Sequence, residues 1–121
     1  MGAGTEQFDR SRRLTSPGDY QRVFSKARRS ADDHLLVLAR DNHLEHARLG
    51  LAIARSKIPR AAARNRIKRI IRESFRQHQQ SLSGLDLVVL ARSNLSRTDN
   101  QALFQSLRAH WDRQQRLKTG V

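Results

Sequence analysis

The chain has 121 residues, a length that suits one domain, and its 24 Lys and Arg residues outnumber 11 Asp and Glu, giving a formal charge of +13. It contains no cysteine, which excludes disulfides, a disulfide-linked partner and thiolate metal sites. It has neither a run of about 20 apolar residues that would span a membrane nor an apolar N-terminal stretch typical of a secretory signal. We therefore expect a cytoplasmic protein without membrane contacts.

The excess of positive charge indicates a polyanionic partner. Of the 24 basic residues, 20 are Arg and four are Lys. The planar guanidinium group binds phosphate through two parallel hydrogen bonds and stacks on bases, whereas the Lys ammonium group is a hydrated point charge. This composition favours a nucleic acid over an anionic membrane surface, but it does not distinguish RNA from DNA.

The first half of the chain predicts one helix and two or three strands. Residues 1–13 are polar and aperiodic, and we expect a flexible tail there. Residues 16–19 combine a Ser N-cap, a Pro at the first helical position and an Asp near the positive end of the helix dipole, before apolar residues at helical spacing. Residues 34–40 and 49–54 read as strands, and their short link predicts an antiparallel hairpin. A very short edge strand is expected near residue 30.

The second half predicts two helices around one strand. Residues 60–79 have a helical pattern, and residues 85–91 are apolar at nearly every position, which is typical of a strand covered on both faces. N-cap signals at residues 96–101 precede a last striped helix, and a basic tail follows at 116–121. The expected fold is α+β: a small α-β sandwich over residues 14–115, with three helices on one mixed sheet of three or four strands.

The predicted helix at residues 60–79 is strongly basic. Nine bases and one acid lie between residues 55 and 76. With about 100° per residue, the isoleucines share one face with Phe75, and the opposite face carries Asn65, Lys68, Arg69, Arg72 and Arg76. We call these five residues the basic ridge.

The ridge favours a binding role over a merely solvated helix face. Like charges four residues apart repel each other, and only Glu73, beside Arg69, is placed to relieve this repulsion. Phosphates along the ridge would remove the repulsion, so we interpret it as a nucleic-acid-binding surface. Arg64 and Arg66 lie on opposite shoulders of the first turn.

Residues 63–76 read Ala-Arg-Asn-Arg-Ile-Lys-Arg-Ile-Ile-Arg-Glu-Ser-Phe-Arg. This segment resembles the signature of the bacterial ribonuclease P protein subunit. The resemblance covers roughly residues 11–113 and includes the aromatic first helix, the Gly-Leu-Ala-Ile strand at 50–53 and the Trp-bearing last helix. It implies an αβββαβα sandwich with a left-handed βαβ crossover, contrary to the general handedness rule.

The resemblance also implies a function. Members of this family are RNA-binding subunits that assist a catalytic RNA in removing the 5′ leader from precursor tRNA, so the holoenzyme is an endoribonuclease whose catalysis comes from RNA. We expect no catalytic residue, metal ligand or cofactor in the protein itself, and Mg²⁺ held mainly by the RNA. The expected RNA-binding residues are Arg64, Asn65, Arg66, Lys68, Arg69, Arg72, Arg76, Arg55 and Lys57.

By the same resemblance, Tyr20 and Phe24 line a cleft for the single-stranded leader. From the residues alone, two aromatic rings four positions apart on an apolar helix face are better explained as core residues. Two departures from the family bear on the cleft. Arg55 and Lys57 flank a serine where the family usually has two lysines, and an aromatic often found in the preceding strand is absent from residues 35–38.

Two other functions compete with this one. A structural ribosome-associated RNA-binding protein would share the basic helix but would lack a selective leader cleft. A self-contained metal nuclease would need a carboxylate cluster, and residues 32–34, Asp-Asp-His, have no second carboxylate motif to support them. The five histidines show no zinc-like spacing.

Overall fold

The computed structural model describes residues 12–118. Its elements follow the expected αβββαβα order, and they are α2 (Pro17–Ser25), β1 (Arg28–Ala31), β2 (Leu35–Asp41), β3 (Arg48–Ala52), α3 (Ala61–His78), β4 (Leu85–Ala91) and α4 (Asn100–Lys118). The tail expected at 1–13 lies outside the described residues except for its last two positions. The basic tail expected at 116–121 begins inside α4, which continues to Lys118.

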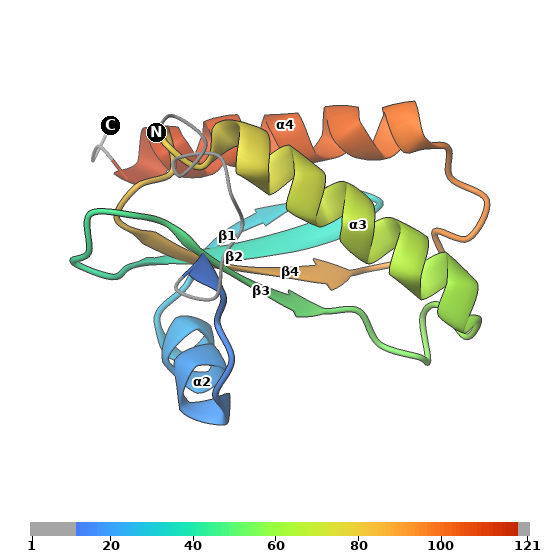
Figure 1. Cartoon of the computed structure of the whole chain (residues 1–121), viewed down its shortest axis with the longest axis horizontal. Helices are drawn as coiled ribbons and strands as arrows, with labels where there is room; N and C mark the ends of the chain where they lie inside the picture. The colour runs from blue at the N-terminus through green and yellow to red at the C-terminus, as the bar shows by residue number, and fades with distance from the viewer. Residues whose placement is uncertain (1–11, 119–121) are drawn as a thin grey trace, which may run out of the picture.

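The molecule has three layers, with α3 and α4 on one face of the sheet and α2 on the other (Figure 1). The larger core lies between the sheet and the two long helices, where Ile71, Phe75, Leu87 and Trp111 are buried. A smaller core under α2 contains Leu14, Val23, Leu38 and Val88. This arrangement confirms the predicted α+β sandwich.

The order of the strands is β1-β2-β4-β3, so the predicted hairpin between the second and third strands is wrong. β2 pairs antiparallel with β4, and β3 pairs parallel with β4. β4 is buried at every position except Leu90, and a strand that is apolar on both faces buries the most surface at the centre of a sheet. The short edge strand expected near residue 30 is confirmed as β1, which pairs with β2.

The link between β2 and β3 passes around the start of β4. The Asn42 amide donates to the Gly84 carbonyl (2.8 Å), and the Gly84 amide donates to the His46 carbonyl (3.3 Å). Gly84 has φ 86°, a backbone conformation that favours glycine. β2 and β3 are therefore joined by a short loop but do not pair with each other, because β4 lies between them.

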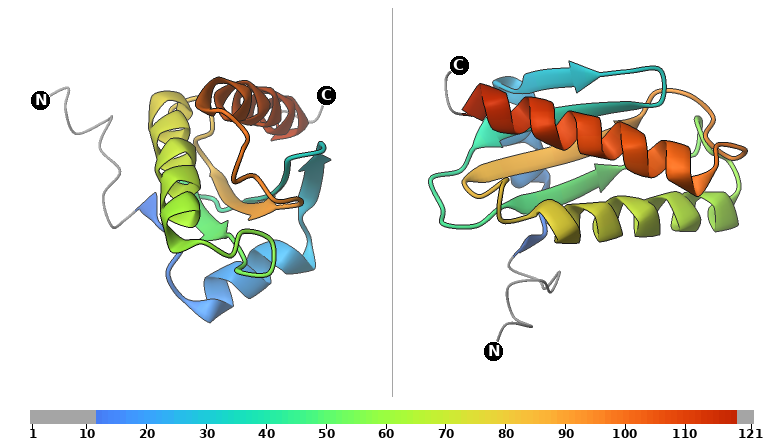
Figure 2. Two further views of the ribbon diagram at one scale, coloured as in Figure 1. Left: turned by 90° about the vertical axis from the view of Figure 1, so that its right-hand side faces the viewer. Right: turned by 90° about the horizontal axis from the view of Figure 1, so that it is seen from above.

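The β3–α3–β4 connection is left-handed. In the right-hand view of Figure 2, α3 and α4 face the viewer, the parallel strands β3 and β4 run to the right, and β4 lies above β3. About 98% of such connections have the opposite hand. The unusual hand implied by the sequence resemblance is therefore present.

The outer edge of β3 is covered by the chain before α2. Arg13 forms a parallel bridge with Leu49, and the Leu14 amide donates to the Leu49 carbonyl (2.9 Å). α2 then begins with a capping box: the Asp19 amide donates to the Ser16 hydroxyl (3.1 Å), and the Ser16 amide points back to the Asp19 carboxylate. This confirms the helix start predicted at residues 16–19.

Candidate nucleic-acid interface

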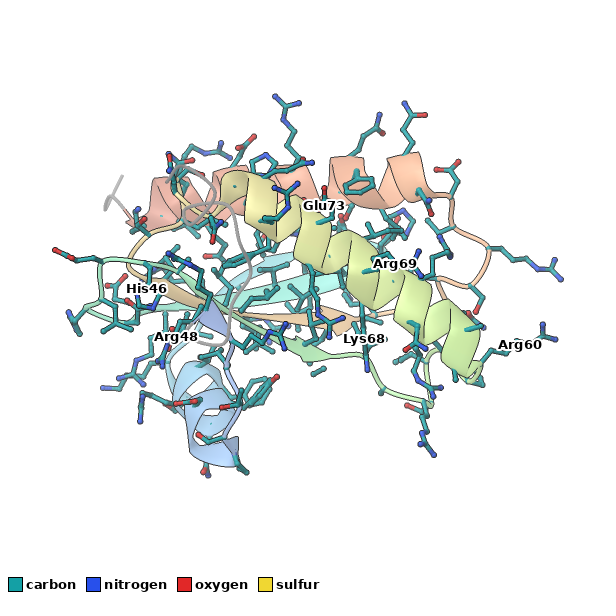
Figure 3. All side chains as sticks on the ribbon, viewed as in Figure 1. His46, Arg48, Arg60, Lys68, Arg69 and Glu73 are labelled. Carbon is teal, nitrogen blue, oxygen red and sulfur yellow. The ribbon has the colours of Figure 1, made fainter. Side chains whose placement is uncertain are left out.

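α3 is amphipathic in the predicted sense. Ile67, Ile70, Ile71 and Phe75 are buried against the sheet and α4. The opposite side carries the basic ridge, along which Figure 3 shows Lys68 and Arg69. Because α3 has neither a side-chain N-cap bond nor an acid in its first turn, packing rather than local electrostatics holds this helix together.

Three ridge residues are available to a ligand. Asn65 and Arg69 are exposed and Lys68 is partly exposed. Within residues 12–118, the side chains of these three residues make no hydrogen bond or ion pair. Their donors therefore face solvent without a protein acceptor, as a phosphate-binding surface requires.

Arg64 and Arg66, in contrast, also bind the protein itself. Arg64 Nη1 donates to the carbonyls of Ile58 (2.9 Å) and Pro59 (2.7 Å) in the segment before α3. Arg66 donates to the Asn100 side chain (2.7 Å) and to the carbonyls of Leu95 and Ser96, in and before the first turn of α4. Both side chains thus fix the segments around them, and these partners could not be predicted from the sequence.

Glu73, the one acidic residue of α3, pairs with a different arginine from the one expected. Glu73 accepts two hydrogen bonds from Arg76, at 3.0 and 2.7 Å, rather than relieving Arg69. The bond from Arg76 lowers the pKa of Glu73. The two planar groups match in this bidentate geometry, which holds Arg76 at the rear of the ridge and leaves Arg69 uncompensated.

Arg55 and Lys57 lie on the exposed turn between β3 and α3. The amides of Lys57 and Ile58 both donate to the Ala54 carbonyl, and buried Ile58 anchors the turn in the core. The two cations therefore precede the ridge on a fixed support, but on a separate element.

Lys68 and Arg72 border a small cavity of about 160 Å³ together with Arg13 and Tyr20. Partial burial and the positive charge of Arg13 lower the pKa of Arg72. Cations from the segment before α2 and from α3 therefore converge next to the aromatic residues of the predicted cleft. The ridge thus divides, with Lys68 and Arg72 toward α2 and Arg69 toward α4.

The two aromatic residues of the predicted cleft lie next to each other but have different surroundings. The Tyr20 hydroxyl accepts from the Leu51 amide (3.1 Å) and donates to the Leu51 carbonyl (3.4 Å), which ties α2 to the edge of β3. Phe24 is 46% exposed, and its ring centre lies 6.5 Å from that of Tyr20. Tyr20 is thus partly structural, whereas Phe24 presents a ring to solvent.

The sheet beside α2 offers an apolar floor. Leu36, Ala52 and Leu90 lie in one row across β2, β3 and β4 and are partly buried against the α2 cluster. Leu36 lies in the stretch where the family often has an aromatic. The predicted cleft would therefore have aliphatic side chains on its floor and the aromatic rings on α2.

Gly50 is required for the close contact between β3 and Tyr20. A Cβ atom at Gly50 would lie 2.8 Å from two carbons of the Tyr20 ring. We expect Gly50→Ala to lower the free energy of unfolding by about 1–3 kcal/mol, because the ring must move while β3 stays paired with β4. Urea denaturation measures this, with Gly18→Ala as the control, since its Cβ would meet only the Ser16 hydroxyl at 3.9 Å. Equal stability of the two variants would contradict the expectation.

A buried polar cluster, not predicted from the sequence, joins α4 to β1. The Ser30 hydroxyl lies 2.6 Å from His110 Nδ1, and His110 Nε2 lies 3.1 Å from an Asp32 carboxylate oxygen. Ser30 and His110 are each 1% exposed, and Arg113 also donates to the Ser30 hydroxyl (3.0 Å). A serine enclosed in this way cannot reach a substrate, so the cluster is structural despite its resemblance to a hydrolase triad.

This cluster predicts a pH-dependent stability. Burial lowers the pKa of His110 from its ordinary 6.5, outweighing the nearby Asp32 carboxylate, and the positive charge of Arg113 adds to the lowering. Burial alone would raise the pKa of Asp32, but hydrogen bonds from Ser106 and the backbone lower it to about 2, so Asp32 stays ionised near neutral pH. Below about pH 6.5 the unfolded chain binds a proton at His110 that the folded protein does not.

The free energy of unfolding should therefore fall as the pH drops through this value, by at most about 1.4 kcal/mol per pH unit for one proton. Urea denaturation from about pH 7.5 to 5 measures the slope. His110→Gln should show a shallower slope, since it removes this group and leaves the other histidines. Identical slopes in the two proteins would contradict the assignment.

The described residues support neither a metal site nor a membrane-spanning helix. Within residues 12–118, no group of three or more His, Asp or Glu side chains is placed to hold a metal ion. No helix among these residues is both long and apolar enough to cross a membrane. Asp32, considered above for a metal nuclease, is instead hydrogen-bonded to the Ser106 hydroxyl (2.5 Å) and to the amides of His34 and Leu35.

The fold and this surface define a class: a small basic α+β protein whose left-handed crossover helix carries cations on its outer side. The family model for ribonuclease P matches residues 8–115. The chain therefore belongs to the ribonuclease P protein family, as the motif at residues 63–76 predicted.

Curated relatives and solved structures agree with this assignment. The chain is 49% identical over 104 residues to the ribonuclease P protein component of Methylococcus capsulatus, covering 86% of this chain and 81% of that protein. It is 44% identical over 116 residues to the component from Vibrio cholerae, covering 96% and 98%. The ribonuclease P proteins of Thermotoga maritima and Staphylococcus aureus superpose with TM-scores of 0.74 and 0.75, at 30% and 29% identity. These alignments cover 84% and 81% of this chain, and 96% and 90% of the solved chains. They do not support the ribosome-associated alternative.

Proposed function

We propose that this protein binds the catalytic RNA subunit of ribonuclease P and helps it to remove the 5′ leader from precursor tRNA. The observation that carries this proposal is the ridge on α3. Asn65, Lys68 and Arg69 face solvent there without hydrogen-bond or ion-pair partners among the described residues. RNA phosphates would supply those partners and relieve the repulsion along the helix.

The leader would lie in the cleft beside α2. Phe24 offers a ring face on which any base can stack, and the aliphatic floor of the sheet lies beside it. Lys68 and Arg72 line the cavity next to Tyr20, so one strand of phosphates would pass from the ridge to the cleft. The protein would thus position substrate and catalytic RNA relative to each other.

The hydrolytic step is assigned to the RNA. Hydrolysis needs an activated water or nucleophile, and residues 12–118 contain no group of three or more His, Asp or Glu side chains placed to hold a metal ion for this task. Mg²⁺ would be held mainly by RNA, with the protein contributing charge and orientation. A cytoplasmic location and the lack of a protein-bound cofactor stay predictions from the sequence.

Reconstitution tests this function. The protein with a bacterial ribonuclease P RNA should cleave precursor tRNA at a low Mg²⁺ concentration at which the RNA alone is slow, and the protein alone should not cleave. RNA-free turnover that survives nuclease treatment of the sample would instead show a protein nuclease. Equal affinity for precursor and mature tRNA, without stimulation of the RNA, would show a general RNA-binding protein.

A further inference from the structure

A groove between α3 and α4 extends well beyond the ridge. It consists of three cavities of about 580, 260 and 660 Å³. The first and second share Arg66, and the second and third share Phe104. The groove therefore begins among the basic residues at the start of α3, passes Arg69, and ends at His78 and Arg108.

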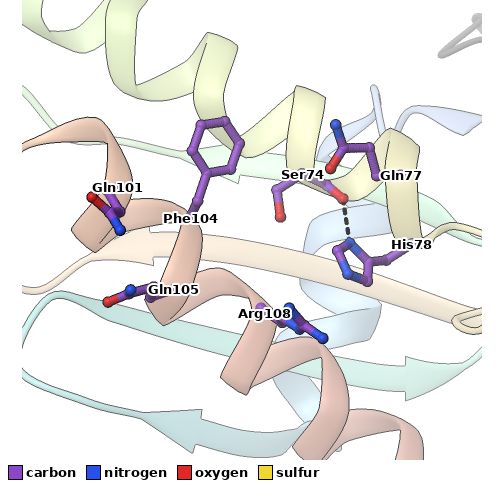
Figure 4. A pocket seen from close by; sticks show the side chains of 7 residues that line it. All are labelled: Ser74, Gln77, His78, Gln101, Phe104, Gln105 and Arg108. Atoms are coloured by element: carbon purple, nitrogen blue, oxygen red, sulfur yellow. Dashed lines mark hydrogen bonds between the residues drawn. The ribbon is translucent and has the colours of Figure 1, made fainter.

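The third cavity combines an aromatic ring with amide side chains (Figure 4). Phe104 is partly exposed, and its inner side packs against the main core. Gln101 and Gln105 extend from the same helix, and Gln77 lies across from them on α3. The volume of about 660 Å³ falls within the range of small-ligand sites, roughly 300–1,000 Å³.

Several polar groups of this cavity have no protein partner. The side chains of Gln101, Gln105 and Arg108 make no hydrogen bond or ion pair within the described part of the chain. His78 Nδ1 lies 2.8 Å from the Ser74 carbonyl. Because a carbonyl only accepts, Nδ1 must carry the proton, and in the neutral ring Nε2 remains as an acceptor. The cavity therefore offers both donors and acceptors around an aromatic face.

These features match an unpaired nucleotide. Unstacked RNA bases bind by stacking on aromatic rings and by hydrogen bonds along their edges, which amide and imidazole groups provide. The charge also fits, since the groove has Arg66, Arg69 and Arg108 along it, while its acid Glu73 is neutralised by Arg76. An acidic peptide would satisfy the arginines but would leave the ring and the amides unused.

We propose that the groove binds an unpaired nucleotide of the RNA subunit, with its base stacked on Phe104 and its phosphates near Arg69 and Arg108. This inference rests on the proposed function, because the same RNA would continue from the ridge into the groove past Arg66 and Arg69. It adds a second stacking site, on the opposite side of α3 from Tyr20 and Phe24.

Affinity for the ribonuclease P RNA tests the stacking. Phe104→Leu keeps an apolar side chain against the core but removes the flat ring, and it should weaken binding about 5- to 150-fold. Phe104→Trp keeps a ring and should bind like the unchanged protein. Gln105→Ala should weaken binding, whereas Gln115→Ala, an exposed glutamine on the same helix outside the groove, should not. Melting temperatures verify that each variant is folded.

Chemical probing of the RNA gives a second measurement that does not depend on affinity. With saturating protein, one or a few unpaired bases should be protected from a reagent that modifies base edges, and they should become reactive again in the Phe104→Leu complex. Unchanged affinity and unchanged protection with Phe104→Leu would overturn the proposal. An effect of Arg108→Ala without one of Phe104→Leu would also overturn it, since it indicates phosphate contacts without a stacked base. If the proposed function itself were wrong, the unchanged protein would neither bind nor protect this RNA.

Discussion

Replacing Lys68, Arg69 and Arg72 together with alanine should weaken binding to the catalytic RNA on the order of a hundredfold or more at about 0.1 M salt, without unfolding the protein. Each phosphate contact contributes roughly 0.7–0.9 to the slope of log K against log salt concentration, so the slope should flatten by about 2.1–2.7. The fold should persist because none of the three side chains is buried in the core. Binding titrations over a salt series measure the slope.

Two comparisons sharpen this experiment. Arg29→Ala removes an exposed cation on β1, away from α3, and should change the slope less than Arg69→Ala does. Arg64→Ala with Arg66→Ala should lower both RNA affinity and thermal stability, because both arginines donate to backbone carbonyls. A triple variant with an unchanged slope would show that the ridge does not meet phosphate.

Phe24→Ala should lower affinity for precursor tRNA about 5- to 150-fold, if the ring stacks on one base of the leader. Mature tRNA has no leader and should bind the variant holoenzyme as before. Because stacking accepts any base, the effect should depend on the length of the leader more than on its sequence. Phe24 is 46% exposed, so the melting temperature should change little.

Tyr20 provides the contrast. Its hydroxyl bonds to the Leu51 backbone and its ring packs on Gly50, so Tyr20→Ala should lower stability toward the cost of about 3–5 kcal/mol seen for buried aromatics. It should weaken all functions together. If Phe24→Ala also melts early and loses precursor and mature tRNA equally, Phe24 is a core residue and the leader cleft is wrongly assigned.

Local signals in the sequence predicted the elements but not the order of the strands. The N-cap at Ser16, the helical period of residues 60–79 and the apolar run at 85–91 each act within one segment, and each element is found where it was expected. The position of β4 between β2 and β3, in contrast, depends on which of several strands, far apart in the chain, pair with one another. The short 42–47 link suggested a hairpin because link length alone cannot show that a third strand occupies the centre.

The candidate site likewise has a part that could be predicted from the sequence and a part that could not. The ridge on α3 follows from spacing on one helix, and its cations lie on the outer side as predicted. The bond from Arg66 to the Leu95 carbonyl before α4, the Ser30–His110 contact and the alignment of Phe104 with α3 each join residues at least 29 positions apart. Gln101 and Arg108 stand three positions before and four positions after Phe104 in the sequence, but this spacing became informative only beside α3.

The contacts of residues 13, 14 and 20 with β3 have a consequence for the behaviour of the free protein. An open sheet edge is a template for pairing with another chain, and such pairing leads to aggregation. Leu14 occupies the outward carbonyl of Leu49, and the Tyr20 hydroxyl occupies both outward groups of Leu51. At the other edge, β1 is only four residues long and begins with two arginines, whose charge repels a second copy. Both edges thus disfavour pairing with a further strand, so we expect copies of the free protein to remain dispersed at high concentration.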